Sequence, residues 1–128
     1  MKKWIFLLLA VMMLTACGQT NHEIQEAVYV TITAEEAKSL MDSQEGYIIL
    51  DVRTREEYDQ GHIPGAILIP NTEIGDRAEE VLTDKEQLIL VYCRSGRRSK
   101  LAAEELAKLG YTNIKEFGGI IDWPYEVE

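Results

Sequence analysis

The stretch LILVYCRSGRRSKL, residues 88–101, decides the fold of this chain because it runs from a strand through a short loop into a helix. The run 88–91 is continuously apolar, which is typical of a strand that is buried on both faces of its sheet. Beyond the loop, apolar residues return at helical spacing from Leu101 to Leu109. A buried strand followed by a returning helix is the building unit of an α/β fold with a parallel sheet.

The same alternation continues along the rest of the chain. We expect strands at 29–32, 47–52, 66–69, 88–92 and 113–117, with the second and fourth of them central in the sheet. Two stretches, 33–36 and 54–57, have the Thr-x-x-Glu spacing of a capping box and should begin helices that end near residues 43 and 60. A third helix is expected within 73–82, and a fourth should begin near Ser99 and end at Gly110. The sequence therefore predicts an α/β fold with a five-stranded parallel central sheet and helices on both faces.

The first residues have the pattern of an export signal. Lys2 and Lys3 precede an apolar run at 4–14 that is too short to span a bilayer as a helix. The run leads into Leu-Thr-Ala-Cys at 14–17, which resembles the lipobox of bacterial lipoproteins, where the cysteine is lipidated and becomes the new N-terminus. We therefore expect a signal peptide at 1–16, a lipidated N-terminus and polar tether at 17–27, and one folded domain at 28–128.

Two simpler interpretations of this first segment are an uncleaved hydrophobic helix and an ordinary secretory signal that leaves Cys17 free. The lipoprotein interpretation makes Cys17 the lipidation site. On that interpretation the protein is extracytoplasmic and is anchored to the bacterial cell membrane through its lipid.

The charge of the chain excludes some classes of partner. The formal net charge is −9, with 22 acidic and 13 basic residues, and two of the basic residues lie in the expected signal peptide. Nucleic acid is therefore not an expected partner, and a polybasic attachment to anionic lipid is not expected either. The three arginines at 94–98 must form a local cationic site in an acidic protein.

Cys93 is the residue of the domain that calls for a chemical explanation. The chain has two cysteines, so if Cys17 carries lipid, Cys93 has no partner for a disulfide. Outside the cytosol an unpaired thiol is exposed to oxidation, so Cys93 should be either buried and inert or reactive.

The loop after Cys93 is suited to stabilising a thiolate. A helix N-terminus contributes about 0.3–1 kcal/mol, which is less than one pKa unit at about 1.36 kcal/mol per unit. Inward backbone amides and guanidinium charge are therefore needed as well, and Gly96 favours the tight curl that turns amides inward. We predict that Cys93 is a nucleophile. The candidate residues that would bind an anionic substrate beside it are Arg94, Ser95, Gly96, Arg97, Arg98 and Ser99.

Each of these candidates also has a structural interpretation. Cys93 could be a small apolar residue at the end of a strand. Any of the three arginines could be a solvated surface charge or pair with Glu104 or Glu105, and we expect at least one of them to do so. Ser99 could be a plain N-cap of the helix.

Two stretches of the sequence resemble the rhodanese family, which moves sulfane sulfur through a cysteine persulfide. The stretch YDQGHIPGAILI at 58–69 fits the family's signature around H-I-P-G-A, and CRSGRRS at 93–99 fits its active loop. Weaker matches are Asp-Val-Arg at 51–53, Gly-Gly at 118–119 and Trp123. Together these positions cover 29–123, so we expect a single rhodanese-like domain, without a second copy that would add substrate contacts.

The resemblance implies an activity and roles for individual residues. Cys93 would take sulfur from thiosulfate, polysulfide or a persulfide donor and pass it to cyanide or a thiol, without a metal or an organic cofactor. Another protein is then a candidate sulfur acceptor. The resemblance also implies that His62 belongs to a structural turn rather than acting as a general base, and that Asp51 and Arg53 form a structural ion pair. Trp123 is expected in the core or in a lid.

Two other classes of function are compatible with parts of this pattern. A cysteine phosphatase or arsenate reductase would have C-x5-R, but the seventh position of this loop is Ser99, and Arg98 closes a ring of six residues. The tighter ring favours sulfur over a tetrahedral oxyanion. A non-catalytic, membrane-tethered sulfur carrier or persulfide-sensing module is the second alternative.

Overall fold

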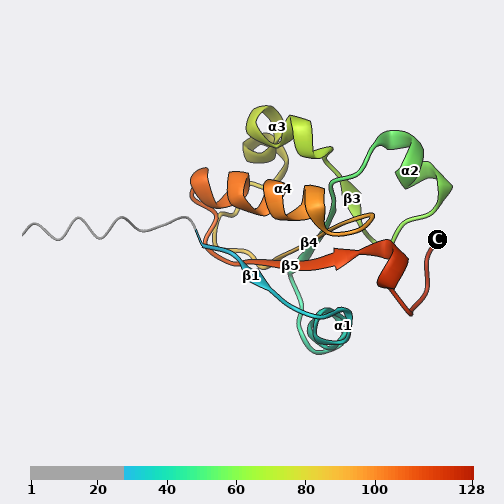
Figure 1. The fold of residues 1–128 in the computed structure, drawn as a ribbon. Helices are drawn as coiled ribbons and strands as arrows, with labels where there is room; N and C mark the ends of the chain where they lie inside the picture. The colour runs from blue at the N-terminus through green and yellow to red at the C-terminus, as the bar shows by residue number, and fades with distance from the viewer. Residues whose placement is uncertain (1–27) are drawn as a thin grey trace, which may run out of the picture.

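Parallel strands form the centre of the structure, as the apolar runs of the sequence predict (Figure 1). The computed structural model describes residues 28–128. The strands are β1 (Val30–Thr31), β2 (Ile48–Asp51), β3 (Ile67–Leu68), β4 (Ile89–Cys93) and β5 (Ile114–Gly119). Their order in the sheet is β1-β5-β4-β2-β3, and all neighbouring pairs are parallel. The two apolar runs expected in the centre of the sheet, β2 and β4, are both interior strands.

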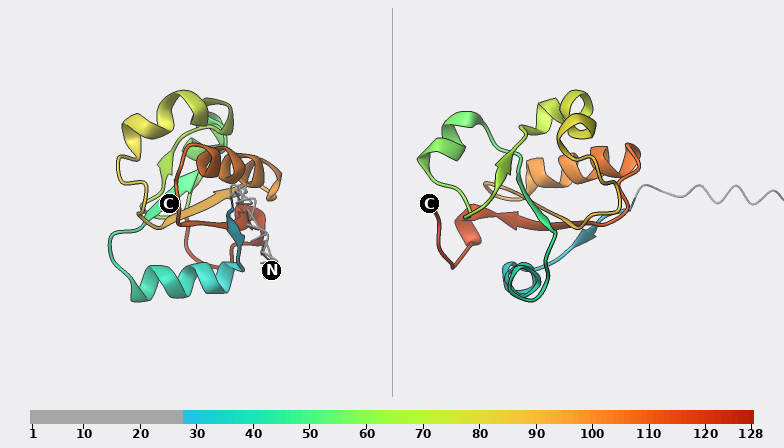
Figure 2. Two further views of the ribbon diagram at one scale, coloured as in Figure 1. Left: turned by 90° about the vertical axis from the view of Figure 1, so that its left-hand side faces the viewer. Right: turned by 180° about the vertical axis from the view of Figure 1, so that it is seen from behind.

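Helices cover both faces of this sheet, which confirms the predicted α/β fold (Figures 1 and 2). They are α1 (Ala34–Ser43), α2 (Arg55–Gln60), α3 (Ile74–Val81) and α4 (Arg97–Lys108), with short 3-10 turns η1 (Asn71–Glu73) and η2 (Ile120–Asp122). The helices α3 and α4 lie on one face and α1 lies on the other. Among residues 28–128, no helix has both the length and the apolar character needed to cross a bilayer.

The central strand β4 is buried along its whole length. Because successive side chains of a strand point to opposite faces, Ile89, Val91 and Cys93 pack in the cluster that includes α3 and α4. Leu90 and Tyr92 pack in the cluster on the α1 face. The cysteine therefore lies on the α4 side of the sheet, directly before the loop that leads into α4.

The helix boundaries agree with the capping signals, with two differences. Thr54 and Glu57 form the complete capping box of α2. At α1 the Thr33 hydroxyl accepts from the Glu36 amide, but the Glu36 carboxylate accepts from that hydroxyl instead of the backbone, so the expected box is incomplete. The second difference is that α4 begins at Arg97, earlier than the expected Ser99, because Gly96 adopts a left-handed conformation and serves as the N-cap.

The strand β5 extends beyond its expected end at residue 117. It continues to Gly119, which pairs with Cys93 across an irregularity in the register between Val91 and Cys93. This extension places the Gly118-Gly119 pair beside the cysteine loop. The expected signal peptide, the lipidation site Cys17 and the tether lie outside the described residues.

Candidate active site

The candidate site is formed where β4 ends and α4 begins. Cys93 is the last residue of β4, and only Arg94, Ser95 and Gly96 separate it from the first helical residue. Gly96 has a φ of 105°, a left-handed conformation that favours glycine. The turn at Gly96 brings the loop back over the cysteine, so the sequence-predicted curl is present in the structure.

The sulfur atom of Cys93 faces the backbone of this loop. Its Sγ accepts a hydrogen bond from the Gly96 amide at 3.0 Å and lies 3.4 Å from the Ser99 hydroxyl. The side chain is buried, with a relative exposure of 1%. Burial by itself raises the pKa of the thiol, but hydrogen bonds from Ser99 and from the Gly96 and Ser95 amides outweigh it and lower the Cys93 pKa below its ordinary value. The buried cysteine is therefore placed to form a thiolate.

The buried carboxylate of Glu116, which no local sequence pattern indicates, connects the cysteine loop to β5. Glu116 on β5 is fully buried, and its Oε1 accepts from the Ser99 hydroxyl at 2.6 Å and from the Gly118 amide at 2.8 Å. Its Oε2 accepts from the Thr31 hydroxyl at 3.1 Å and lies 3.7 Å from Lys100 Nζ. The only sequence signal for this residue was a charge within a predicted strand.

The hydroxyl of Ser99 has one proton and several acceptors within reach. The Glu116 carboxylate at 2.6 Å is closer than the Gly96 carbonyl at 3.0 Å. The hydroxyl proton is therefore shared, and the Ser99 hydroxyl acts together with the backbone amides of Ser95 and Gly96 in stabilising the sulfur anion. Ser99 therefore links the nucleophile to Glu116 rather than serving as a plain N-cap.

The loop also lies in direct contact with the end of β5. A Cβ atom added to Gly119 would overlap the backbone carbonyl of Arg94. In addition, the Ile121 amide donates to the Arg94 carbonyl oxygen at 3.3 Å. The absence of a side chain at Gly119 is therefore a condition for the observed position of the loop.

The three arginines of the loop have different environments. Arg98 is half-buried, and its two terminal nitrogens donate to the two carboxylate oxygens of Glu57 at 2.6 and 2.8 Å. Arg94 and Arg97 are exposed and form no ion pair with any residue of 28–128. The expectation that an arginine would pair with a glutamate is met, but the partner is Glu57 of α2 and not Glu104 or Glu105.

The ion pair of Arg98 changes the titration of both groups. The Arg98 guanidinium lowers the pKa of the Glu57 carboxyl to about 2. Glu57 in turn raises the Arg98 pKa, with a smaller contribution from the negative charge of ionised Cys93. The pair is therefore fully charged at any pH in the neutral range, and Arg98 lies near enough to the sulfur to interact with its charge.

Asp51 and Arg53 form a separate, buried network on the next strand. The Arg53 guanidinium pairs with Asp51 at 2.6 Å, and the Tyr92 hydroxyl donates to the same carboxylate at 2.7 Å. The Ile63 amide donates to the Tyr92 oxygen, and Arg53 donates to the Gly61 carbonyl. This geometry confirms the predicted structural ion pair and shows that it also fastens the 61–63 turn.

The contacts of His62 are those of a turn residue. Its ring stacks on Tyr58 with centroids 3.8 Å apart, and Nδ1 lies 3.0 Å from the Tyr58 carbonyl oxygen. Its Nε2 lies 3.3 Å from the Glu128 carboxylate. Trp123 is half-buried, packs against Phe117 and Tyr125 at the margin of the core on the α1 face, and lines the hollow that contains Arg94.

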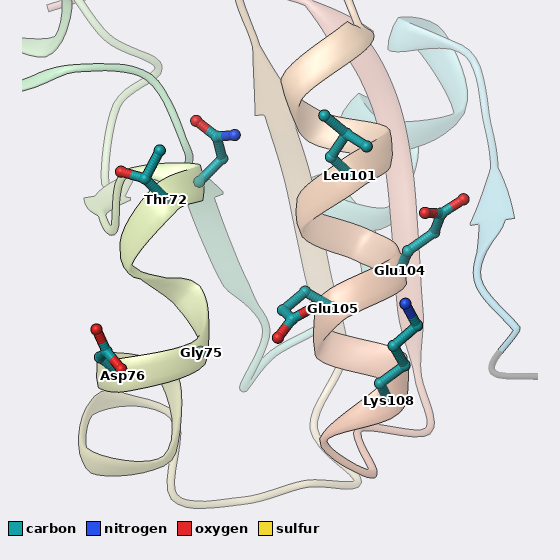
Figure 3. Close-up of a pocket in the computed structure, with 8 residues that line it drawn as sticks. Thr72, Gly75, Asp76, Leu101, Glu104, Glu105 and Lys108 are labelled. Carbon is teal, nitrogen blue, oxygen red and sulfur yellow. The ribbon is translucent and has the colours of Figure 1, made fainter.

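Two surface hollows differ in their suitability for an anionic substrate. One, of about 380 Å³, lies beside the loop and is lined by residues that include Arg94, Glu57, Ile121 and Trp123. The other, of about 330 Å³, lies between α3 and α4 and contains no residue of the cysteine loop (Figure 3). Asp76, Glu104 and Glu105 line that second hollow against the single cation Lys108, so its charge disfavours an anion.

No site for a metal ion is evident in residues 28–128, where no three His, Cys, Asp or Glu side chains are grouped as ligands. The charged groups around Cys93 are instead arginines, a lysine and the buried Glu116. The arrangement can stabilise a sulfur anion and attract a small anion to it.

Comparison with known proteins identifies the family of this chain. The sequence pattern of the rhodanese-like domain family matches residues 33–124. The thiosulfate sulfurtransferase PspE of Escherichia coli is 42% identical over 73 residues, which are 57% of this chain and 70% of PspE. YrkF of Bacillus subtilis, whose name describes it as a candidate sulfur carrier protein, is 42% identical over 98 residues, which are 76% of this chain. The match spans only 52% of the length of YrkF.

A solved structure supports the same assignment. The structure described as rhodanese with anions from E. coli superimposes with a TM-score of 0.61 and 38% sequence identity. The superposition covers 64% of this chain and 96% of that one. The five-stranded parallel sheet, the loop after β4 and these similarities agree, and the chain belongs to the rhodanese-like domain family.

Proposed function

We propose that this protein is a sulfurtransferase that carries sulfane sulfur as a persulfide on Cys93. The observation that carries the proposal is the position of the Cys93 sulfur, which accepts from the Gly96 amide at 3.0 Å in the turn between β4 and α4. The name of PspE, and the anions in the E. coli rhodanese structure, support thiosulfate and other small anionic donors as substrates.

The first half of the proposed reaction loads the cysteine. The Cys93 thiolate attacks the outer sulfur of thiosulfate, the sulfur–sulfur bond of the donor breaks, and sulfite leaves with the electron pair. Cys93 then holds a persulfide anion. The loop amides that lower the thiol pKa are the donors available to stabilise this second anionic sulfur. Polysulfide or a low-molecular-weight persulfide would load the cysteine in the same way.

The second half returns the cysteine to its starting state. Cyanide or a thiolate attacks the outer sulfur, a new bond forms to that sulfur, and the Cys93 thiolate leaves with the electron pair. The hollow of about 380 Å³ beside Arg94 provides open space next to the loop for an acceptor. A thiol on another protein is an acceptor of the same chemistry.

The test of this proposal is direct detection of the intermediate. After incubation with thiosulfate, intact-mass spectrometry should show the addition of one sulfur atom, and cyanide should then release thiocyanate and restore the original mass. Absence of both the mass increase and thiocyanate with thiosulfate, polysulfide and glutathione persulfide would refute the proposed activity. Persulfide formation without turnover would favour the sulfur-carrier alternative.

We also propose that the protein acts outside the cytoplasm, attached to the membrane by lipid on Cys17. The support for this proposal is the order of charged, apolar and Leu-Thr-Ala-Cys segments at 2–17. A Cys17→Ser variant should move from the membrane and detergent phase to the aqueous phase. Unchanged membrane retention of that variant would contradict lipidation.

A further inference from the structure

The ion pair between Arg98 and Glu57 joins the cysteine loop to a helix that the proposed reaction does not otherwise use. Arg98 presents both terminal nitrogens to Glu57, at 2.6 and 2.8 Å. This two-pronged geometry is the one in which a guanidinium binds an anionic oxygen pair of a substrate. Glu57 therefore occupies the face of Arg98 that an anionic donor would use.

Glu57 is held in this position independently of Arg98. Its Oε1 also accepts from the Thr54 amide at 3.3 Å and from the Thr54 hydroxyl at 3.1 Å, as part of the capping box of α2. The carboxylate is thus held by Thr54 as well as by Arg98. Because the Glu57 pKa is lowered to about 2, it keeps its negative charge throughout the neutral range.

The charge around the loop follows from this arrangement. Glu57 neutralises Arg98, whereas Arg94 and Arg97 have no ion-pair partner in residues 28–128. Glu57 and Arg94 line the same hollow of about 380 Å³, so an anion that enters it meets both groups. Arg53 lines it too, but its charge is compensated by Asp51. A doubly charged anion therefore gains less binding free energy at this site than three arginines would provide, because Glu57 already neutralises the charge of Arg98.

We propose that Glu57 is a specificity-determining residue that competes with the donor for Arg98 and so disfavours doubly charged sulfur donors relative to singly charged ones. This inference rests on the proposed sulfurtransferase function. It assigns to α2 a role in choosing the donor.

The charge of Glu57 can be removed while its shape is kept. A Glu57→Gln variant retains a carbonyl oxygen that can accept from the Thr54 amide, but it no longer neutralises Arg98. The KM for thiosulfate, a dianion, should fall about two- to fivefold, the range of an exposed to half-buried ion pair. The KM for methanethiosulfonate, a monoanion that donates sulfur and releases methanesulfinate, should fall by only about the square root of that factor. The kcat should stay within about twofold for both donors.

Glu56 provides a matched control on the same helix. It is exposed and forms no ion pair in the described part of the chain, so Glu56→Gln changes the net charge equally without uncovering Arg98. Both KM values should be nearly unchanged in this control. An equal shift in the two variants would show that only the overall charge matters and would overturn the inference.

A rise in the KM for thiosulfate, instead of a fall, would also overturn the inference. If Glu57 only positions Arg98 for the substrate, Glu57→Gln should raise the KM for thiosulfate instead of lowering it. A constant ratio of the two KM values would likewise exclude a role in donor choice.

A binding measurement separates this inference from the proposed function. Sulfate is a dianion that cannot donate sulfur, and its binding can be followed by NMR shifts of the Ser95 and Gly96 amides. Sulfate should bind about two- to fivefold more tightly to Glu57→Gln than to the wild type or to Glu56→Gln. If no donor supports turnover, the proposed function fails, but the order of sulfate affinities still tests the inference. Equal sulfate affinities would refute it.

Discussion

The neighbouring strands β2 and β4 both end in an ionisable side chain, and the two strand ends use their charge differently. Asp51 at the end of β2 is fully buried and shares its carboxylate with Arg53 and Tyr92. Cys93 at the end of β4 is equally buried, but its sulfur faces backbone amides of a loop whose side chains reach solvent. The Asp51 network fastens the fold, whereas the Cys93 loop is arranged to stabilise a sulfur anion.

The difference follows from what surrounds each charge. Arg53 also lines the hollow beside the loop, but its guanidinium is buried and already bonded to Asp51 and to the Gly61 carbonyl. Arg94 and Arg97 of the loop are exposed, Arg98 is half-buried, and a hollow opens beside Arg94. A buried ion pair whose polar atoms are all satisfied within the protein is evidence of a structural role, and exposed cations beside an activated thiol are evidence of a site.

The largest effect is expected on sulfur-transfer activity when the residue at the end of β4 is changed. Cys93→Ser should lose sulfur transfer by at least about a thousandfold, because the hydroxyl cannot form the persulfide. Thiocyanate release measures the activity, and thermal unfolding measures the stability. Full activity in this variant would show that Cys93 is not the nucleophile, and the two strand ends would then not differ in function.

The next effect should appear in stability and at the other strand end. Asp51→Ala leaves the Arg53 guanidinium buried without its partner, and should lower the free energy of unfolding by about 3–5 kcal/mol in urea denaturation. Tyr92→Phe, which removes the hydrogen bonds of the Tyr92 hydroxyl to Asp51 and from the Ile63 amide, should cost about 1–3 kcal/mol and still allow a folded protein to be assayed for transfer.

Asp59→Ala is the control for this measurement. Its ion pair with Arg55 at 3.2 Å is largely exposed, with side-chain exposures of 75% and 57%, so its loss should cost less than about 1 kcal/mol. If Tyr92→Phe is stable but inactive, the Asp51 network takes part in the chemistry and the division of roles is wrong.

A glycine substitution should sharpen the link between loop position and activity. Gly119→Ala introduces a Cβ that overlaps the Arg94 carbonyl, so the loop must move away from the sulfur. We expect a loss of roughly a hundredfold in kcat/KM, which is typical of a displacement of about 1 Å in a site. Gly46→Ala is the control, because Gly46 has a positive φ of 74° that strains an alanine but no atom lies within 4 Å of the added Cβ, whereas Gly119 has an extended backbone with a φ of −128°. Equal losses in both variants would show that the overlap with Arg94 is not the cause.

The smallest expected effect is on the pH dependence of the thiol. The Cys93 pKa is lowered, so the rate of alkylation by iodoacetamide should rise with pH and reach its plateau at a lower pH than for an unperturbed cysteine. The protonated thiol is unreactive, so the rate should fall as the pH drops through that pKa. Ser99→Ala should raise the pKa and slow alkylation at neutral pH about two- to tenfold.

Ser95→Ala tests whether the backbone is sufficient. The Ser95 side chain is exposed, and only its amide contributes to lowering the Cys93 pKa. Its pH profile should therefore match that of the wild type. A large shift in this variant, with none in Ser99→Ala, would contradict the contacts described for the loop.

Local patterns in the sequence were sufficient to predict the fold. Continuous apolar runs predicted the buried strands β2 and β4, and the Thr54 to Glu57 spacing predicted the start of α2. The loop was predicted from one cysteine, one glycine and three arginines within the six positions 93–98. Such signals are readable because the residues that interact are near each other in the chain.

The partners of the loop could not be predicted in the same way. Arg98 and Glu57 are 41 residues apart, and Ser99 and Glu116 are 17 residues apart. No local spacing indicates that these pairs meet, and Glu57 had already been explained by its capping box. The position of Gly119 against the loop depends on a register irregularity between β4 and β5, which has no sequence signal.

The amino-acid sequence by itself determined the parallel α/β architecture, the strand that carries Cys93 and the cationic character of the loop, because periodicity, capping and turn propensity act over a few residues. The tertiary structure decided which arginine forms an ion pair, which carboxylate is buried beside the cysteine loop and which amides face the sulfur. Those choices depend on the packing of β5, α2 and α4 around the end of β4, and only the folded chain brings these segments together.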